Sequence, residues 1–175
     1  MNKSKNKGKQ FERTVCKIFE SVYNEQFIRV PNSGAFIGGS NINNIKITEN
    51  GQNLSYFRGD IIPPKKYEKL IIECKKRAKI DLYSIITGNI TEIKEWLKQL
   101  YNDYRPDEQF IRLLIISANS KKPLVVFNSK YHLEYTFQNY LIIQIDNIIE
   151  NLSKDFIITE LSDVFLIKNE INFKI

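Results

Sequence analysis

Three acidic residues stand where the local pattern predicts apolar ones, and Lys75 lies two positions after the last of them. Glu12 borders the apolar stripe of a predicted helix, and Asp60 lies near the start of a predicted strand. Glu73 and Lys75 fall within the next predicted strand. Burying an unpaired charge costs on the order of several kcal/mol, and three neighbouring carboxylates would also repel one another. A divalent cation removes both penalties, and carboxylate oxygens suit Mg²⁺ or Mn²⁺.

The chemistry that these side chains would support is the cleavage of a phosphodiester. A metal bound to Asp60 and Glu73 would lower the pKa of a bound water and stabilise the charge on the attacked phosphate. Lys75 would orient or deprotonate that water, or neutralise the charge that develops on the phosphate. The residue types and their positions therefore predict a metal-dependent phosphodiesterase site.

Two predicted strands would position most of this site. Because side chains alternate faces along a strand, Glu73 and Lys75 share one face, and Cys74 lies on the other, away from the acids. The preceding strand, over residues 58–62, is joined to this one by a short connection. A short connection favours an antiparallel pair, so Asp60 and Lys75 are expected near the same end of that pair.

Glu12 is expected on a helix over residues 9–23. Apolar side chains recur there at spacings of three and four, which is typical of a helix with one buried face; they are Phe11, Val15, Ile18, Phe19 and Val22. Residues 1–8 precede this helix as a lysine-rich arm that we expect to be mobile.

The remaining elements are predicted from periodicity and from turn residues. Asn50-Gly51 between alternating segments predicts an inserted β-hairpin within residues 35–57. A helix is expected over 82–104, which Gly88-Asn89 could interrupt. Strands are expected over 26–30, 110–117, 123–127, 140–145, 156–160 and 163–167, and short helices over 131–137 and 147–152.

Composition narrows the class of protein. The net charge of +6 and the pI near 9.2 favour an anionic partner, nucleic acid first and a membrane surface second. The 2 cysteines are too few for a disulfide framework. No apolar run reaches the roughly 20 residues of a membrane span, and the basic N-terminus leads into an amphipathic segment rather than a signal peptide. We therefore expect a cytoplasmic protein with no membrane partner.

The order of these parts resembles the PD-(D/E)xK nuclease superfamily, and within it the archaeal-type Holliday junction resolvases. The resemblance covers residues 7–35 and 58–86. It rests on a Lys-Gly followed by Glu-Arg in 7–13, an Arg-x-x-x-Ser-Gly loop in 29–34, an Asp-bearing strand in 59–62 and a Glu-x-Lys strand in 72–75. Gly59 stands where the superfamily pattern has a proline.

The resemblance implies a fold and a role for each site residue. The fold would be α/β, a restriction-endonuclease-like core with a mixed central β-sheet of four or five strands flanked by helices. Asp60 and Glu73 would bind the metal together with the backbone carbonyl of Cys74, and Lys75 would act on the water. Glu12 would complete the metal site, directly or through a metal-bound water.

The basic side chains near these motifs are candidates for contacts to DNA phosphates. The basic candidates are Lys9, Arg13, Arg29, Arg58, Lys76, Arg77 and Lys79. Ser33 is added because the resemblance implies a loop serine near the scissile phosphate. Plainer interpretations stay open. The basic run at 75–79 could be a solvated strand end, and Glu73 with Lys75 could be a surface ion pair on an edge strand. The two cysteines, Cys16 and Cys74, are expected to be reduced core thiols.

The function expected on this basis is Mg²⁺-dependent endonuclease action on DNA, with Mn²⁺ able to substitute. The resolvase resemblance favours a four-way junction as substrate, in recombination or in the processing of replication intermediates, and a C2 homodimer that cuts two strands symmetrically. One alternative is a restriction-like or phage-type nuclease that acts on linear or single-stranded DNA in the host cytoplasm. Another is an inactive DNA-binding protein with this fold. A single nuclease domain is expected over residues 1–175, with a C-terminal extension over 128–175.

Overall fold

The computed structural model describes residues 3–30, 58–88, 90–102, 110–131, 139–149 and 152–166. The chain divides into two compact units, Met1–Cys74 and Lys75–Ile175. The boundary falls inside strand β3 (Leu70–Lys76), so the residues of that strand belong partly to each unit. The expectation of a single domain over residues 1–175 stays a prediction.

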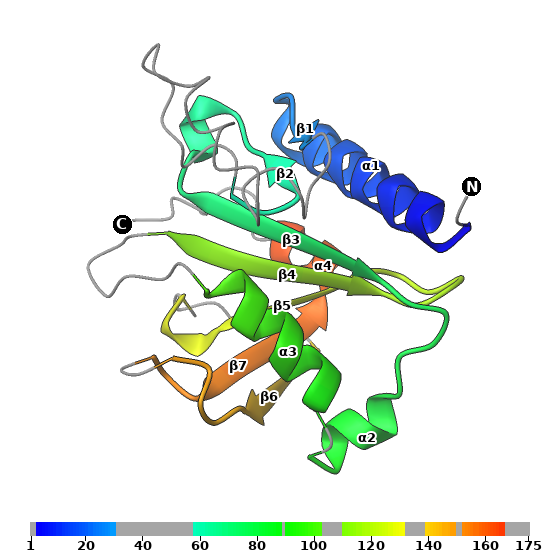
Figure 1. Cartoon of the computed structure of the whole chain (residues 1–175). Coiled ribbons are helices and arrows are strands. Elements are labelled where there is room, and N and C mark those ends of the chain that lie inside the picture. The colour runs from blue at the N-terminus through cyan, green and yellow to red at the C-terminus, as the bar shows by residue number, and fades with distance from the viewer. Residues whose placement is uncertain are drawn as a thin grey trace, which may run out of the picture. The chain divides into compact units, whose positions relative to one another are not determined.

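The first unit opens with helix α1 (Lys3–Tyr23), whose N-terminal part appears in blue in Figure 1. The predicted apolar stripe is confirmed, because its buried members include Phe11, Val15 and Phe19. The helix begins earlier than predicted, so residues 3–8 are helical rather than the mobile arm expected. Lysine is a good helix former, and an interior glycine such as Gly8 costs only about 1 kcal/mol.

Aromatic rings hold the C-terminal end of α1 against the segments that follow it. The ring centroids of Phe19 and Phe27 lie 5.0 Å apart, and those of Tyr23 and Tyr67 lie 4.7 Å apart. Tyr67 belongs to the 3₁₀ turn η3 (Lys65–Tyr67). Each tilted aromatic pair contributes about 0.5–1.5 kcal/mol beyond its buried area, so this cluster fixes the helix on the scaffold of the first unit.

The strands of the first unit confirm the predicted antiparallel pair. Strand β1 (Ile28–Arg29) pairs antiparallel with β2 (Ile61–Ile62), and β2 pairs antiparallel with β3 through Ile61 and Ile72. The segment after β2 begins with two prolines, which cannot donate to a ladder and so end the strand.

The second unit contains four further strands, which pair antiparallel in the order β4-β5-β7-β6. They are β4 (Ile111–Ser117), β5 (Leu124–Asn128), β6 (Tyr140–Gln144) and β7 (Asp155–Glu160). Among the described residues, the mixed sheet has seven strands in the order β1-β2-β3-β4-β5-β7-β6. The predicted α/β class with a mixed sheet is therefore confirmed, whereas the expected count of four or five strands was too low.

Two helices of the second unit replace the single one predicted over 82–104. They are α2 (Leu82–Ile86) and α3 (Thr91–Leu100). The chain breaks between them at Gly88, which has φ of +87°, a conformation that favours glycine. Helix α3 packs against β4, and its buried residues are those of the predicted stripe, namely Ile93, Trp96, Leu97 and Leu100.

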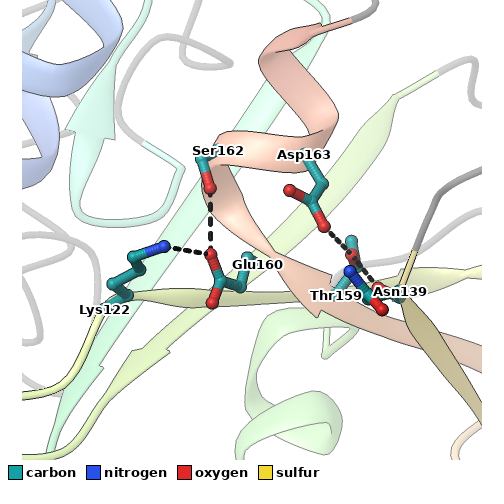
Figure 2. Close-up of polar contacts among 6 residues, drawn as sticks. All are labelled: Lys122, Asn139, Thr159, Glu160, Ser162 and Asp163. Carbon is teal, nitrogen blue, oxygen red and sulfur yellow. Dashed lines mark hydrogen bonds and ion pairs between the residues drawn. The ribbon is translucent and has the colours of Figure 1, made fainter.

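The last described element is helix α4 (Leu161–Leu166), which follows β7 directly. The strand predicted over 163–167 is therefore wrong for residues 163–166. Figure 2 shows the polar contacts at this junction: Thr159 Oγ1 donates to the Asn139 carbonyl at 2.7 Å, and Lys122 pairs with Glu160 at 2.9 Å. These contacts hold the junction between β7 and α4 locally, and the apolar alternation of the segment could not reveal them.

Several other predictions differ from the structure or cannot be compared with it. The helix expected over 147–152 is absent at residues 147–149, where Asn147 has φ of +59°. The inserted hairpin at 35–57 and all but the first residue of the helix at 131–137 lie outside the described residues. Within the described part of the chain, no helix is both long and apolar enough to cross a membrane.

Strand β6 ends the described sheet and is unusual in what it exposes. Tyr140 is 50% exposed, Leu141 37% and Ile142 52%. The strand carries no charged side chain. Sheet edges in soluble proteins usually carry charge, proline or a bulge that discourages further pairing, and β6 has neither charge nor proline.

Candidate active site

Asp60 is held by the backbones of two strands. Its N–H donates to the carbonyl of Ile72 at 2.8 Å, and its own carbonyl accepts from the N–H of Val30 at 2.9 Å. The carboxylate Oδ2 accepts from the N–H of Cys74 at 2.8 Å. The residue is 7% exposed. These contacts fix the backbone of Asp60 and the direction of its carboxylate.

Gly59 makes this position of Asp60 possible. Its φ is +78°, and a Cβ added there would lie 2.5 Å from the carbonyl oxygen of Ile72. Proline locks φ near −65°, so the proline of the superfamily pattern could not take this conformation. Sterics therefore explain why glycine occupies this position: only a residue without a Cβ lets the backbone before Asp60 approach β3 so closely.

Glu12 reaches the same unit from α1 and is paired with an arginine. The Nη1 of Arg29 lies 3.0 Å from Oε2 of Glu12 and also donates to the carbonyl of Val30 at 3.0 Å. Burial raises the pKa of the Glu12 carboxyl and the charge of Asp60 raises it further, while the hydrogen bond from Arg29 opposes both. Arg29, predicted as a DNA contact, thus holds Glu12 in this structure.

The charges of the three acids act together on one thiol. Burial raises the pKa of Cys74 well above its ordinary value, and the carboxylates of Asp60, Glu73 and Glu12 raise it further. We expected Cys74 to face away from the acids, so this influence was not foreseen from strand alternation. The thiol stays protonated at neutral pH, which agrees with the prediction that both cysteines are free and buried.

The donor set of the first unit fits a hard divalent cation. Glu12, Asp60 and Glu73 are 8%, 7% and 6% exposed, and carboxylate oxygens suit Mg²⁺. Among the described residues, no three His, Cys, Asp or Glu side chains are arranged to hold a metal by themselves. Magnesium sites commonly use one or two carboxylates and complete the shell with water and phosphate. Asp60 and Glu73 would supply two such carboxylates, and their role as metal ligands with the Cys74 carbonyl stays a prediction.

Lys75 follows two positions after Glu73 on β3, and its side chain is half-buried. Its ammonium donates to Oε1 of Gln99 on α3 at 2.9 Å. Gln99 was not among the predicted site residues. A glutamine on the polar side of a helix carries no signal of its own in a single sequence, and its partner lies 24 residues earlier in the chain.

One known family matches this sequence. The sequence model of the family described as "Phage putative PDDEXK endonuclease" matches residues 3–172. The chain belongs to this family. No curated protein and no solved structure matches the chain. The match covers nearly all of the sequence, so the recognition of the PD-(D/E)xK superfamily is confirmed, whereas a particular closeness to archaeal resolvases is not.

The Asp and Glu-x-Lys of the pattern after which the PDDEXK family is named occur directly before β2 and on β3. An Asp followed by Glu-x-Lys occurs as Asp60, Glu73 and Lys75. As a member of this family, the chain is assigned to the endonucleases. The role of each individual residue remains a proposal.

The remaining predicted DNA contacts of this PDDEXK endonuclease fall into distinct environments. Lys76 is half-buried, and its ammonium donates to Ser117 Oγ at 3.0 Å and to the Ala118 carbonyl at 2.6 Å. Arg77 pairs with Glu92 and lies over the Trp96 ring, 4.8 Å from its centroid. These two residues fasten the end of β3 to its own unit.

The other candidate cations are placed differently. Lys9 and Arg13 are exposed on α1, Lys79 is exposed after β3, and Arg58 is half-buried. Ser33 lies outside the described residues. Lys76 is half-buried, and Arg77, although exposed, is paired with Glu92. Lys9, Arg13 and Lys79 are therefore better candidates for phosphate contacts than these two.

Proposed function

We propose that this protein is a metal-dependent endonuclease that hydrolyses phosphodiester bonds in DNA, with Mg²⁺ as the preferred ion and Mn²⁺ able to substitute. The observation that carries the proposal is the family match over residues 3–172. It is supported by the burial of Asp60 and Glu73, the two carboxylates of the D…ExK pattern, and by a third buried carboxylate in the same unit, Glu12. The net charge of +6 agrees with a polyanionic substrate.

Each residue has a proposed role in the reaction. Asp60 and Glu73 hold the cation together with the Cys74 carbonyl, and the backbone N–H of Cys74 keeps the Asp60 carboxylate in place. Glu12 adds a third negative charge to the site, directly or through water. Lys75 orients the attacking water or stabilises the charge on the phosphate. When bound, the divalent ion supplies Lewis acidity and lowers the pKa of a coordinated water.

The substrate is best proposed from the family description. Because the matched family is one of phage endonucleases, we propose a phage-type nuclease that acts on linear or single-stranded DNA in the host cytoplasm. Cleavage of a four-way junction by a C2 homodimer, which the resolvase resemblance favoured, is the finer alternative. A cleavage assay that compares a four-way junction with a linear duplex of matched sequence distinguishes the phage-type nuclease from the junction resolvase.

The deciding experiment measures Mg²⁺-dependent cleavage by the full chain and by two variants. We expect EDTA to abolish cleavage, and Asp60→Asn and Lys75→Ala to lower its rate on the order of a hundredfold or more. Asp146→Asn is a matched control, since it makes the same carboxylate-to-amide change at an exposed residue paired with Lys154. Cleavage that survives EDTA and both variants would refute the proposed site. Tight DNA binding without cleavage would favour the inactive DNA-binding alternative.

A further inference from the structure

We propose that Gln99 is a positioning residue for Lys75, an inference that rests on the function proposed above for this lysine. The ammonium of Lys75 donates to Oε1 of Gln99 at 2.9 Å. Both residues belong to the second unit. Gln99 is exposed, so its side chain is not needed to fill the core, and its contact with Lys75 calls for another explanation.

Residues on one side of α3 contact the side chains of Lys75 and Arg77 around the C-terminal end of β3. Glu92, Trp96 and Gln99 are spaced by four and three residues and so share one side of the helix. Arg77 contacts the first two of these, and Lys75 contacts the third. Lys75 and Arg77 are two positions apart in extended chain and therefore point to the same face. The side chains on one face of the strand end therefore contact the side chains on one side of α3.

The chain on both sides of this contact is anchored. The N–H of Arg77 donates to the Ser117 carbonyl at 3.0 Å, which fixes the strand end beside β4. The C-terminal end of α3 is held by Arg112, fully buried on β4, whose Nε donates to the Leu100 carbonyl at 3.3 Å. With both backbones fixed, Gln99 limits the directions in which the Lys75 side chain can point.

A neutral amide suits this task. Lysine has a flexible four-carbon stem and three N–H donors, so one bond to a fixed acceptor orients the ammonium while still allowing contacts to water and phosphate. The amide oxygen does so without adding a negative charge that would repel DNA. Gln99 is expected to act through Lys75 and to make no contact with the reacting atoms.

The test compares steady-state cleavage of DNA by two variants of the full chain. Gln99→Met keeps the length of the side chain but removes the strong acceptor, and we expect kcat to fall about tenfold with KM changed by less than about twofold. Gln99→Glu keeps an acceptor at the same place and should restore kcat to within about threefold of the wild type. Lys98→Gln is the control on the neighbouring position of α3, where the exposed Lys98 pairs with Glu95 of the same helix.

A double-mutant cycle separates positioning from a merely structural effect. In single-turnover cleavage, Gln99→Met should cause no further loss in a Lys75→Ala background, because residues that act as one unit are not additive. An equal loss in both backgrounds, or an unchanged kcat for Gln99→Met alone, would overturn the inference. If Lys75→Ala itself cleaves like the wild type, the proposed function of Lys75 fails instead, so the two failures are distinguishable.

Discussion

At the scale of single residues, Glu12 shows how a buried acid in a candidate site lowers the stability of the folded protein. Its carboxylate is buried on α1, where burial and the charge of Asp60 both raise its pKa, and Arg29 relieves this only in part. A carboxyl whose pKa is raised in the folded state binds protons more readily there than in the unfolded chain. Its ionisation therefore lowers stability as pH rises from its ordinary pKa of 4.5 through the raised value.

The variant Glu12→Gln should consequently be more stable than the wild type at pH 8, by about 1 kcal/mol, and equally stable near pH 4, where both side chains are uncharged. The amide oxygen of the glutamine can still accept a hydrogen bond from Arg29, so the guanidinium keeps an acceptor. Urea unfolding at the two pH values measures the difference. The same variant should cleave DNA poorly if Glu12 completes the site.

Glu25→Gln, at an exposed residue after α1, serves as the control and should change the free energy of unfolding by less than about 0.5 kcal/mol. A wild type that is more stable than Glu12→Gln at pH 8 would show instead that the pair with Arg29 is net stabilising.

The sequence revealed some site residues and hid others for a physical reason. Asp60 and Glu73 were visible because an acid beside buried β-branched residues breaks a pattern that can be read locally. The partners of the site were not visible, since Arg29 meets Glu12 across 17 residues and Lys75 meets Gln99 across 24. Such pairs depend on how the elements pack, and a single sequence contains no direct record of that.

At the scale of elements, the turn before β2 places a strict steric demand on one residue. Gly59 combines φ of +78° with a contact of its missing Cβ position to the Ile72 backbone. Replacing it with alanine should destabilise the protein by about 2 kcal/mol or more, because both strain and a backbone clash are introduced. Since Asp60 is the next residue, cleavage should fall as well; urea unfolding and the cleavage assay measure the two effects.

Gly8→Ala is the matched control, because a Cβ at this position in α1 meets nothing within 4 Å. Removing a glycine from a helix interior should stabilise the protein by about 0.5–1 kcal/mol. If Gly59→Ala were tolerated as well as Gly8→Ala, the turn would not have the rigidity inferred for it.

Long apolar strands and amphipathic helices were predicted well because their periodicity is strong. The buried strand β4 and the stripe of α3 agree with expectation. Predictions failed where short-range polar contacts decide the outcome, as at α4, where Thr159, Glu160 and Asp163 are held in a local network. The break between α2 and α3 was foreseen as an option but could not be chosen, because a glycine is tolerated in many helices.

At the scale of the whole molecule, the family match extends well beyond the motifs that suggested it. The resemblance covered residues 7–35 and 58–86, whereas the match runs from residue 3 to residue 172. The strands after β3 therefore lie within the region that the family shares, although they contain none of the sequence motifs on which the resemblance was based. Strands were also predicted over 140–145 and 156–160, and the observed strand order includes them as β6 and β7.

The exposed strand β6 leads to a prediction about how the purified protein behaves at high concentration. Tyr140, Leu141 and Ile142 lie on the last strand of the described sheet, and an uncharged edge of this kind can template pairing between copies. We expect sedimentation velocity to show reversible self-association that grows with protein concentration and that Ile142→Lys suppresses. Cleavage per active site should be the same for both proteins. Identical sedimentation of the two would mean that the edge is covered in solution. If the association is observed, the charged variant would be the better sample for concentrated work, including crystallisation with DNA.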